Sequence, residues 1–288
     1  KGYTQEEVSY GICTPASLSR IENGAQKPGR LILEKLFERL GTENNLFNSF
    51  VSKEEMELYS EIQTLIRDIT DEDVVKIEKQ IDVVEKLAVN TTELEHQCLY
   101  FAKGELARQK EKDDKKAMEM YMKAIHITLP DFDGKNPLRN NLLTFDEIMI
   151  INAIAILHAK ADDIMTAVQL GMWLKKYMEE KIVDGTMKIA KYPMILYNLS
   201  NWLGRENCHK EALKMADLGI RFCIRYGNLA FFPILVFNKG GALAELGKID
   251  QAKKYLHQSV TIFEAMDRPD LIQVATDWCK LHYRIDIQ

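Results

Sequence analysis

Three asparagines carry the chemistry that is needed to hold a peptide chain. Asn198 and Asn238 each stand fourteen residues before an alanine of a repeating helical pattern (Ala212 and Ala252), and Asn152 falls within one position of that register. An amide side chain has a donor and an acceptor together, so it can pair with both sides of a peptide bond. The row predicts a groove that binds an extended peptide through its backbone. The alternative for each single asparagine is that it caps or braces a neighbouring repeat.

Aromatic and basic residues near these asparagines are candidates to read the side chains and ends of such a peptide. The candidates for apolar pockets are Tyr100, Phe101, Tyr197, Trp202, Phe231 and Phe232. The candidates to meet a carboxylate are Lys103, Lys191 and Lys239. The competing interpretation is that the aromatic residues at helical spacing are core and the lysines are solvated.

The residue types that enzymes use show no catalytic spacing. The six histidines contain no H-E-x-x-H pattern, and the five cysteines contain no C-x-x-C pair. Phosphate-binding loops and nucleophile elbows are also missing from the sequence. The run Asp131 to Asn136 resembles a calcium loop only faintly, since its terminal glutamate is missing, and a polar turn is the better interpretation. We expect no enzyme activity, no metal and no cofactor.

The elements that would position the asparagines are repeated helix pairs. Residues 238–259 place Gly240, Gly247, Ala252 and Leu256 at the spacing of a tetratricopeptide repeat, with Ser259 in place of the usual alanine. Small residues are needed where two antiparallel helices cross closely. Weaker copies surround Ala212, Ala167 and Ala117, and residues 58–89 predict a further degenerate helix pair. Residues 51–288 therefore predict a right-handed solenoid of about five repeats, with a plain helical bundle as the alternative.

The first 50 residues predict a small helix-turn-helix domain. Thr4 can cap a short helix, Gly11 supplies a turn, and Thr14 can cap a second helix that has Pro15 at its first position and stops at Gly24. A third amphipathic helix follows, with Leu31, Leu33, Leu36, Phe37 and Leu40 recurring before Gly41. Two short helices joined by a glycine turn fit a DNA major groove. A purely structural hairpin is the alternative, and either way the fold class is all-α.

Composition limits how such a protein can bind DNA. The net charge of the chain is −5, and residues 1–50 hold six basic and six acidic side chains. Binding must then depend on a local basic cluster, for which Arg20, Lys27 and Arg30 are the candidates. The widely spaced cysteines fit reduced thiols in a cytoplasm, and no apolar run is long enough for a membrane span.

The residues T-Q-x-x-V, a turn and S-x-I-E-x-G resemble the lambda-repressor-like (Xre) helix-turn-helix family. Together with the degenerate repeats, they make the whole chain resemble the RRNPP family of Gram-positive peptide-pheromone receptors, and most of all its PlcR-type regulators. The likeness is carried by residues 11–24, 151–159 and 238–259. It implies a homodimeric cytoplasmic transcription factor that binds a palindromic DNA site and a short imported signalling peptide in quorum sensing.

The resemblance also implies roles for particular residues. The recognition helix would meet bases through Thr14, Pro15, Ala16, Ser17 and Arg20, and Arg20 is the candidate for guanine because its fork matches O6 and N7. The groove asparagines Asn152, Asn198 and Asn238 would act as backbone clamps.

The sequence departs from the family pattern in one respect, and two rival functions remain open. The family has a further helix before the T-Q segment, so we expect the chain that begins at Lys1 to start inside a longer protein. The first rival is a regulator whose repeats bind a partner protein or only dimerise. The second is a Rap-like repeat protein that acts on a response regulator, against which residues 4–24 speak.

Overall fold

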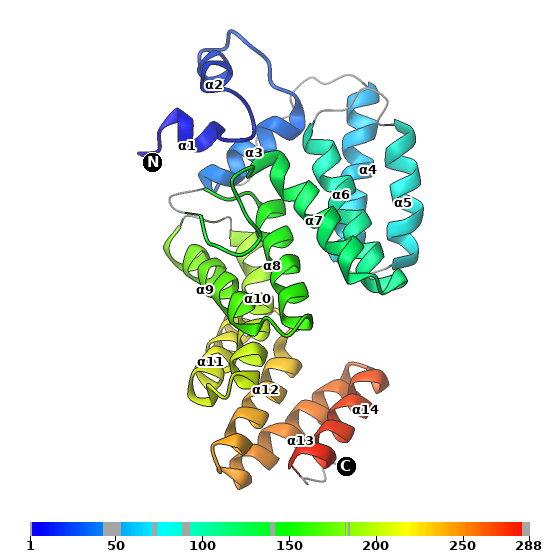
Figure 1. Ribbon diagram of the computed structural model, residues 1–288, viewed down its shortest axis with the longest axis vertical. Coiled ribbons are helices and arrows are strands. Elements are labelled where there is room, and N and C mark those ends of the chain that lie inside the picture. The colour runs from blue at the N-terminus through cyan, green and yellow to red at the C-terminus, as the bar shows by residue number, and fades with distance from the viewer. Residues whose placement is uncertain are drawn as a thin grey trace. The chain divides into compact units, whose positions relative to one another are not determined.

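The computed structural model of this chain is built from helices alone in the part of the sequence that it describes (Figure 1). It describes residues 2–42, 53–70, 74–87, 93–138, 142–181, 183 and 185–283. The all-α class predicted from the sequence is confirmed. The chain divides into two compact units, the first made of Lys1–Leu157 with Lys181–Asp184 and the second of His158–Glu180 with Gly185–Gln288.

The first unit contains three short helices followed by longer ones. Its helices are α1 (Gln5–Ser9), α2 (Pro15–Glu22), α3 (Arg30–Leu40), α4 (Lys53–Thr70), α5 (Val74–Leu87), α6 (Glu93–Leu106), the π-helix η1 (Ala107–Glu111), α7 (Asp114–Thr128) and most of α8 (Phe145–Lys160). The helix pair expected over residues 58–89 is confirmed as α4 and α5. Beyond its acidic first turn, helix α8 is mostly apolar on every side and almost entirely buried, as expected of a central core helix.

The second unit contains the end of α8 and the repeated helix pairs. Its helices are α9 (Ile164–Glu180), α10 (Gly185–Arg205), α11 (His209–Tyr226), α12 (Phe232–Glu245), α13 (Ile249–Ala265), α14 (Pro269–Trp278) and the π-helix η2 (Cys279–Tyr283). Consecutive helices pack against one another from α9 to α14.

The helix-turn-helix, which comprises α1 to α3 and is called the head below, has the caps that the sequence predicts. The Glu7 amide donates to Thr4 Oγ1 at 3.1 Å and the Thr4 amide donates to Glu7 Oε2 at 2.7 Å, which makes a capping box. The Ser17 amide donates to Thr14 Oγ1 at 3.1 Å, with Pro15 beginning α2. Gly41 ends α3 in the left-handed conformation.

The core of the head is shared with the rest of the first unit. Val8, Leu18 and Leu36 form one buried cluster with Leu94 of α6 and Leu142, which precedes α8. The predicted domain boundary near residue 50 lies outside the described residues, and it stays a prediction.

The turn of the head lies directly against the end of α7. Gly11 has φ +69°, and a Cβ atom at this position would lie 2.0 Å from the carbonyl oxygen of Thr128. Beside it, the Tyr10 hydroxyl donates to Asp131 Oδ2 at 2.5 Å. That hydrogen bond, with burial, raises the pKa of Tyr10 to about 12. The backbone of the turn therefore requires glycine both for its conformation and for this close approach.

Small residues allow the helices of the second unit to cross closely. A Cβ atom would lie 2.8 Å from Leu199 at Gly171, 2.8 Å from Leu235 at Gly219 and 2.7 Å from Leu256 at Gly240. The alanines on which the repeat pattern was aligned are buried, namely Ala167, Ala212 and Ala252. This packing agrees with the tetratricopeptide pattern predicted from residues 238–259.

A left-handed residue recurs at short turns between the helices of the repeats, within three of the helix pairs and, at Asp267, between α13 and α14. Asp162, Asn207, Gly247 and Asp267 all have positive φ, and each is followed by one residue before the next helix begins. Asparagine, aspartate and glycine tolerate this conformation better than other residues. Ser259, which replaces the usual alanine, donates its buried hydroxyl to the carbonyl of Pro233 at 2.9 Å.

Two glycine substitutions should separate backbone strain from close approach. Gly24 has the same φ of +69° as Gly11, but a Cβ atom there would meet nothing within 4 Å. We expect Gly24→Ala to lower the free energy of unfolding by about 1 kcal/mol. Gly11→Ala should lower it by at least twice that, because the Thr128 backbone must also move. Urea denaturation measures both, and equal losses would contradict the packing described for Gly11.

Candidate functional site

Helix α2 presents one face to solvent and the other to the core of the head. Pro15, Ala16 and Arg20 are exposed, whereas Leu18 is buried. Thr14, which caps the helix, is exposed as well, and Ser17 is partly buried between the two faces. The structure thus brings the five residues expected to meet DNA bases to the N-terminal and outward part of a single helix.

The guanidinium group of Arg20 is held in place by two neighbours. Its Nη2 donates to Ser17 Oγ at 3.0 Å and its Nε donates to Gln26 Oε1 at 3.0 Å. Ser17 Oγ also accepts a hydrogen bond from the Thr14 hydroxyl at 3.0 Å. The role of Gln26 could not be predicted from the sequence, because Gln26 lies in the loop after Gly24, where helical spacing predicts no contact. Fixing an arginine fork beforehand reduces the entropy that is lost when it binds.

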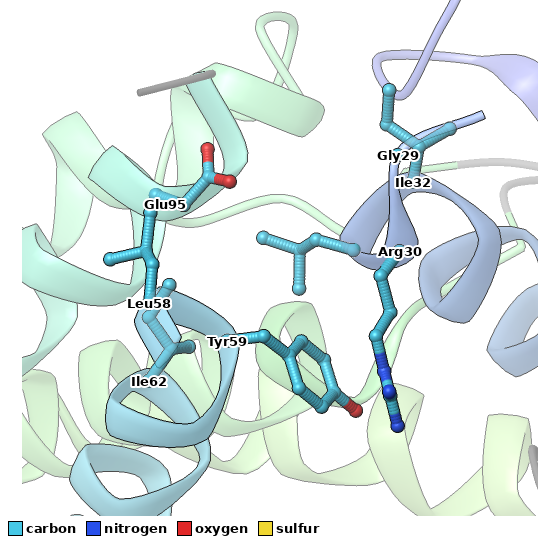
Figure 2. Close-up of a pocket in the computed structure, with 8 residues that line it drawn as sticks. Gly29, Arg30, Ile32, Leu58, Tyr59, Ile62 and Glu95 are labelled. Atoms are coloured by element: carbon cyan, nitrogen blue, oxygen red, sulfur yellow. The ribbon is translucent and has the colours of Figure 1, made fainter. Parts of the chain in front are cut away.

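The two other basic candidates have different surroundings. Lys27 is exposed in the loop between α2 and α3. Arg30, at the start of α3, lies 4.1 Å from the centre of the Tyr59 ring on α4, and Figure 2 shows the two side chains next to each other. Burial, together with Glu34, raises the pKa of Tyr59 to about 12. Arg30 therefore joins α3 to α4 by a cation–π contact, and its role towards DNA stays a prediction.

The cavity beside Arg30 is too small to bind a ligand. It lies between the start of α3, α4 and Glu95 of α6, and it encloses about 50 Å³ (Figure 2). Pockets for small molecules commonly enclose roughly 300–1,000 Å³. This cavity has room for little more than a few water molecules.

A larger apolar cavity lies on the second unit, where the sequence predicts the peptide groove. It encloses about 180 Å³ and is lined mainly by apolar and aromatic side chains from α10, α12, α13 and α14. The lining residues are Tyr197, Asn201, Ile234, Phe237, Asn238, Phe263, Leu271, Val274, Ala275 and Trp278. Helices α10, α12 and α14 are the first helices of successive repeats. Of the predicted peptide-binding residues, Tyr197 and Asn238 are brought together here.

Asn238 has a structural contact as well as a place in this cavity. Its amide nitrogen donates to Ser200 Oγ at 2.7 Å and to the Tyr197 carbonyl at 3.3 Å, which joins α12 to α10. Asn238 therefore braces two neighbouring repeats, which was the alternative interpretation for each asparagine. Both of these hydrogen bonds use its amide nitrogen and neither uses Oδ1. Asn201 was missed by sequence analysis, although it lies one helical turn after Tyr197 on the same helix.

The remaining predicted peptide-binding residues do not line this cavity. In the second unit, Asn198 and Lys191 are buried in α10, and Phe232 is half-buried at the start of α12.

The other three belong to the first unit. There Asn152 is buried in α8, Tyr100 lies beside His96 in α6, and Lys103 pairs with Glu85 of α5 at 2.5 Å. Both members of that pair are partly exposed, as for a surface ion pair, which contributes little to stability. Peptide contacts by these residues stay predictions.

Two further features concern the described part of the chain. No group of three or more histidine, cysteine, aspartate or glutamate side chains there could hold a metal ion. None of its helices is both long and apolar enough to cross a membrane.

The fold is similar to that of PlcR from Bacillus thuringiensis. The crystal structure of PlcR in complex with the peptide PapR7 and DNA superposes with a TM-score of 0.63 at 18% sequence identity, covering 95% of this chain and 94% of that one. The apo form of PlcR gives a TM-score of 0.58 at 17% identity over the same shares of the two chains. No family model matches the sequence, and neither does any curated protein. The resemblance to PlcR-type regulators is confirmed as a likeness of fold.

Two asparagine substitutions test the bracing contact. We expect Asn238→Ala to lower the free energy of unfolding by about 1 kcal/mol, because Ser200 Oγ and the Tyr197 carbonyl lose the amide donor that joins α12 to α10, although the Ser200 hydroxyl still donates to the Tyr197 carbonyl. Asn201→Ala is the matched control, since Asn201 is exposed in the same cavity wall, and it should change stability by no more than about 0.5 kcal/mol. Thermal denaturation monitored by circular dichroism measures both. Equal midpoints for wild type and Asn238→Ala would contradict the bracing role.

Proposed function

We propose that this protein is a peptide-responsive transcriptional regulator of the RRNPP family. It acts as a homodimer in the cytoplasm, binds a palindromic DNA site through α2, and binds a short signalling peptide on the repeats. In this proposal residues 1–50 are the DNA-binding domain and residues 51–288 bind the peptide and form the dimer. No catalytic role is assigned to any residue.

The observation that carries the proposal is the exposed and ordered face of α2. Arg20 is held by Ser17 and Gln26 at the outer surface of a helix whose opposite face is buried. Arginine in a fixed orientation is suited to pair with guanine O6 and N7 in the major groove. Because the chain as a whole is acidic, tight binding requires the contacts of two heads on two half-sites.

The cavity on the second unit supports the peptide half of the proposal. Its volume of about 180 Å³ suits one or two amino-acid side chains, and Asn201 and Asn238 lie at its wall to meet a backbone amide. PlcR, which shares this fold, was solved with both a peptide and DNA. The sequence identity of 18% is too low to carry over individual contacts.

DNA recognition can be tested by selecting bound sequences from a pool of random duplexes. We expect wild type to enrich a palindrome and Arg20→Ala to lose preference at one base pair of each half-site, worth about 1–3 kcal/mol. Lys27→Ala is the matched control, because loss of a phosphate contact weakens all sequences alike and reduces the salt dependence. An Arg20→Ala variant with the wild-type sequence preference would remove the residue from recognition.

Peptide binding can be tested by isothermal titration with synthetic peptides of five to eight residues. We expect Trp278→Ala to weaken binding by about 10- to 100-fold, because Trp278, which is 46% exposed without peptide, would be covered by the bound peptide as an aromatic anchor. Leu281→Ala is the control, since Leu281 is 77% exposed near the same end of the chain and does not line the cavity. If both variants bind a peptide as tightly as wild type, the cavity is not the peptide site.

The two rival functions give different results in the same experiments. Repeats that bind a partner protein or only dimerise predict sequence-specific DNA binding without any response to peptides. A Rap-like action on a response regulator predicts no enrichment of DNA sequences at all. The exposed face of α2 favours either kind of DNA-binding regulator, with or without a response to peptides, over the Rap-like function.

A further inference from the structure

Two buried cations lie on one face of α3, in the head. Lys35 and Arg39 are four residues apart and only 2% and 1% exposed. Buried lysine and arginine side chains need charged partners, because an unpaired charge is strongly unfavourable away from water. Neither residue can therefore reach the solvent or DNA, unlike Arg20 on α2.

The partners of both cations come from the first turn of α8. Lys35 Nζ lies 2.9 Å from Asp146 Oδ2 and Arg39 Nη2 lies 2.8 Å from Glu147 Oε1. Lys35 also pairs with Glu38 on its own helix at 3.0 Å. Burial opposes the charged form of Lys35, but the neighbouring carboxylates outweigh burial and raise its pKa well above the usual value. The lysine therefore stays charged.

Arg39 connects α8 to α1 as well. Its Nη1 donates to the carbonyl oxygens of Val8, at 3.3 Å, and Tyr10. These carbonyls lie at the C-terminal end of α1, where helical carbonyls lack partners within the helix. A single guanidinium group thus joins the end of the first helix of the head to the start of α8.

The carboxylates of the cluster also organise the N-terminus of α8. Glu147 Oε2 accepts from the Thr144 amide at 2.6 Å and the Glu147 amide donates to Thr144 Oγ1 at 3.3 Å, which is a capping-box arrangement. Glu38 Oε2 accepts from the Phe145 amide at 2.8 Å. Glu147 of α8 and Glu38 of α3 thus take part both in the ion pairs and in hydrogen bonds to the amides of Thr144 and Phe145 at the start of α8. Separation of the two helices would therefore expose charges and amides together.

We propose that Lys35, Glu38, Arg39, Asp146 and Glu147 form a lock that fixes the orientation of the head on α8 and that opens as a unit. The lock has two states, because a partly separated buried ion pair keeps the desolvation penalty and loses the attraction. Helix α8 also carries Asn152, five residues after Glu147, inside a buried core. Resting on the proposed function, a ligand that shifts α8 would bias the lock and thereby the position of α2.

Hydrogen–deuterium exchange of the full chain tests the lock without peptide or DNA. The substitution Glu147→Gln keeps an acceptor for the helix cap but leaves Arg39 without a charged partner, so it is combined with Arg39→Met. The double variant Arg39→Met/Glu147→Gln removes both charges, so no lone charge stays buried and the fold is retained, while the links to Val8 and Tyr10 are lost. We expect the amides of α1 and α3 to exchange at least about tenfold faster in the double variant, with α10 to α13 unchanged.

Glu105→Gln is the matched control. Glu105 is also a buried carboxylate of the first unit, paired with Arg108 at 2.5 Å and with the Tyr121 hydroxyl at 2.6 Å, but its partners lie in η1 and α7. It should speed exchange in α6 and α7 and leave α1 and α3 at the wild-type rate. Wild-type exchange in α1 and α3 of the double variant, or equal acceleration there by Glu105→Gln, would overturn the lock.

A second measurement separates the lock from the proposed function. The affinity for a selected DNA duplex is measured with and without a peptide that wild type binds. We expect the peptide to change the DNA affinity of wild type, and the ratio to fall to about one in the double variant while its peptide affinity is kept. A ratio of one already in wild type would count against the peptide response, whereas the exchange result would still decide the lock. An unchanged ratio in the double variant would overturn the coupling through the lock.

Discussion

The structure of the first unit depends on the requirement that buried charge be paired. Lys35 and Arg39 lie in the interior, and their partners, Asp146 and Glu147, are more than 100 residues away in the sequence. The head cannot be placed elsewhere without separating Lys35 from Asp146 and Arg39 from Glu147. Close packing also fixes the turn of the head, since Gly11 lies against the backbone of Thr128. A helix-turn-helix that is often pictured as a separate domain is here fastened to α8 by ion pairs and a hydrogen bond and to the end of α7 by the close approach of its turn.

Close packing has the corresponding role in the second unit. Glycines at the helix crossings let successive repeats approach, and that approach brings α10, α12 and α14 around one cavity. Asn238 illustrates how the cavity and the packing of the repeats share residues, because its nitrogen joins two repeats while it lines the cavity. A repeat protein whose groove residues also brace the repeats would couple occupancy of the groove to the packing of the solenoid.

Much of the fold and part of the candidate site could be predicted from the sequence. The capped helices at Thr4 and Thr14 and the stop at Gly41 depend on residues within four positions of one another. The exposed face of α2, with Arg20, also follows from helical spacing. The contacts of residues whose neighbours come from other segments of the chain were harder to predict. Arg30 lies on Tyr59 and Lys103 pairs with Glu85, each on another helix. Gln26 is close to Arg20 in the sequence, but it lies in a loop, where helical spacing predicts no contact.

By itself, then, the sequence determined the all-α class, the helix-turn-helix with its outward residues and the phase of the repeats, because local hydrogen bonding and periodic burial determine these. Only the tertiary structure decided which polar residues are buried and what they contact. In the sequence, Lys35 and Arg39 cannot be told apart from lysine and arginine residues that are exposed on a helix surface. Likewise, nothing in the sequence near Asn238 shows that its amide joins two repeats. Burial depends on segments that the fold brings together over long sequence distances, and no local pattern in the chain encodes that proximity.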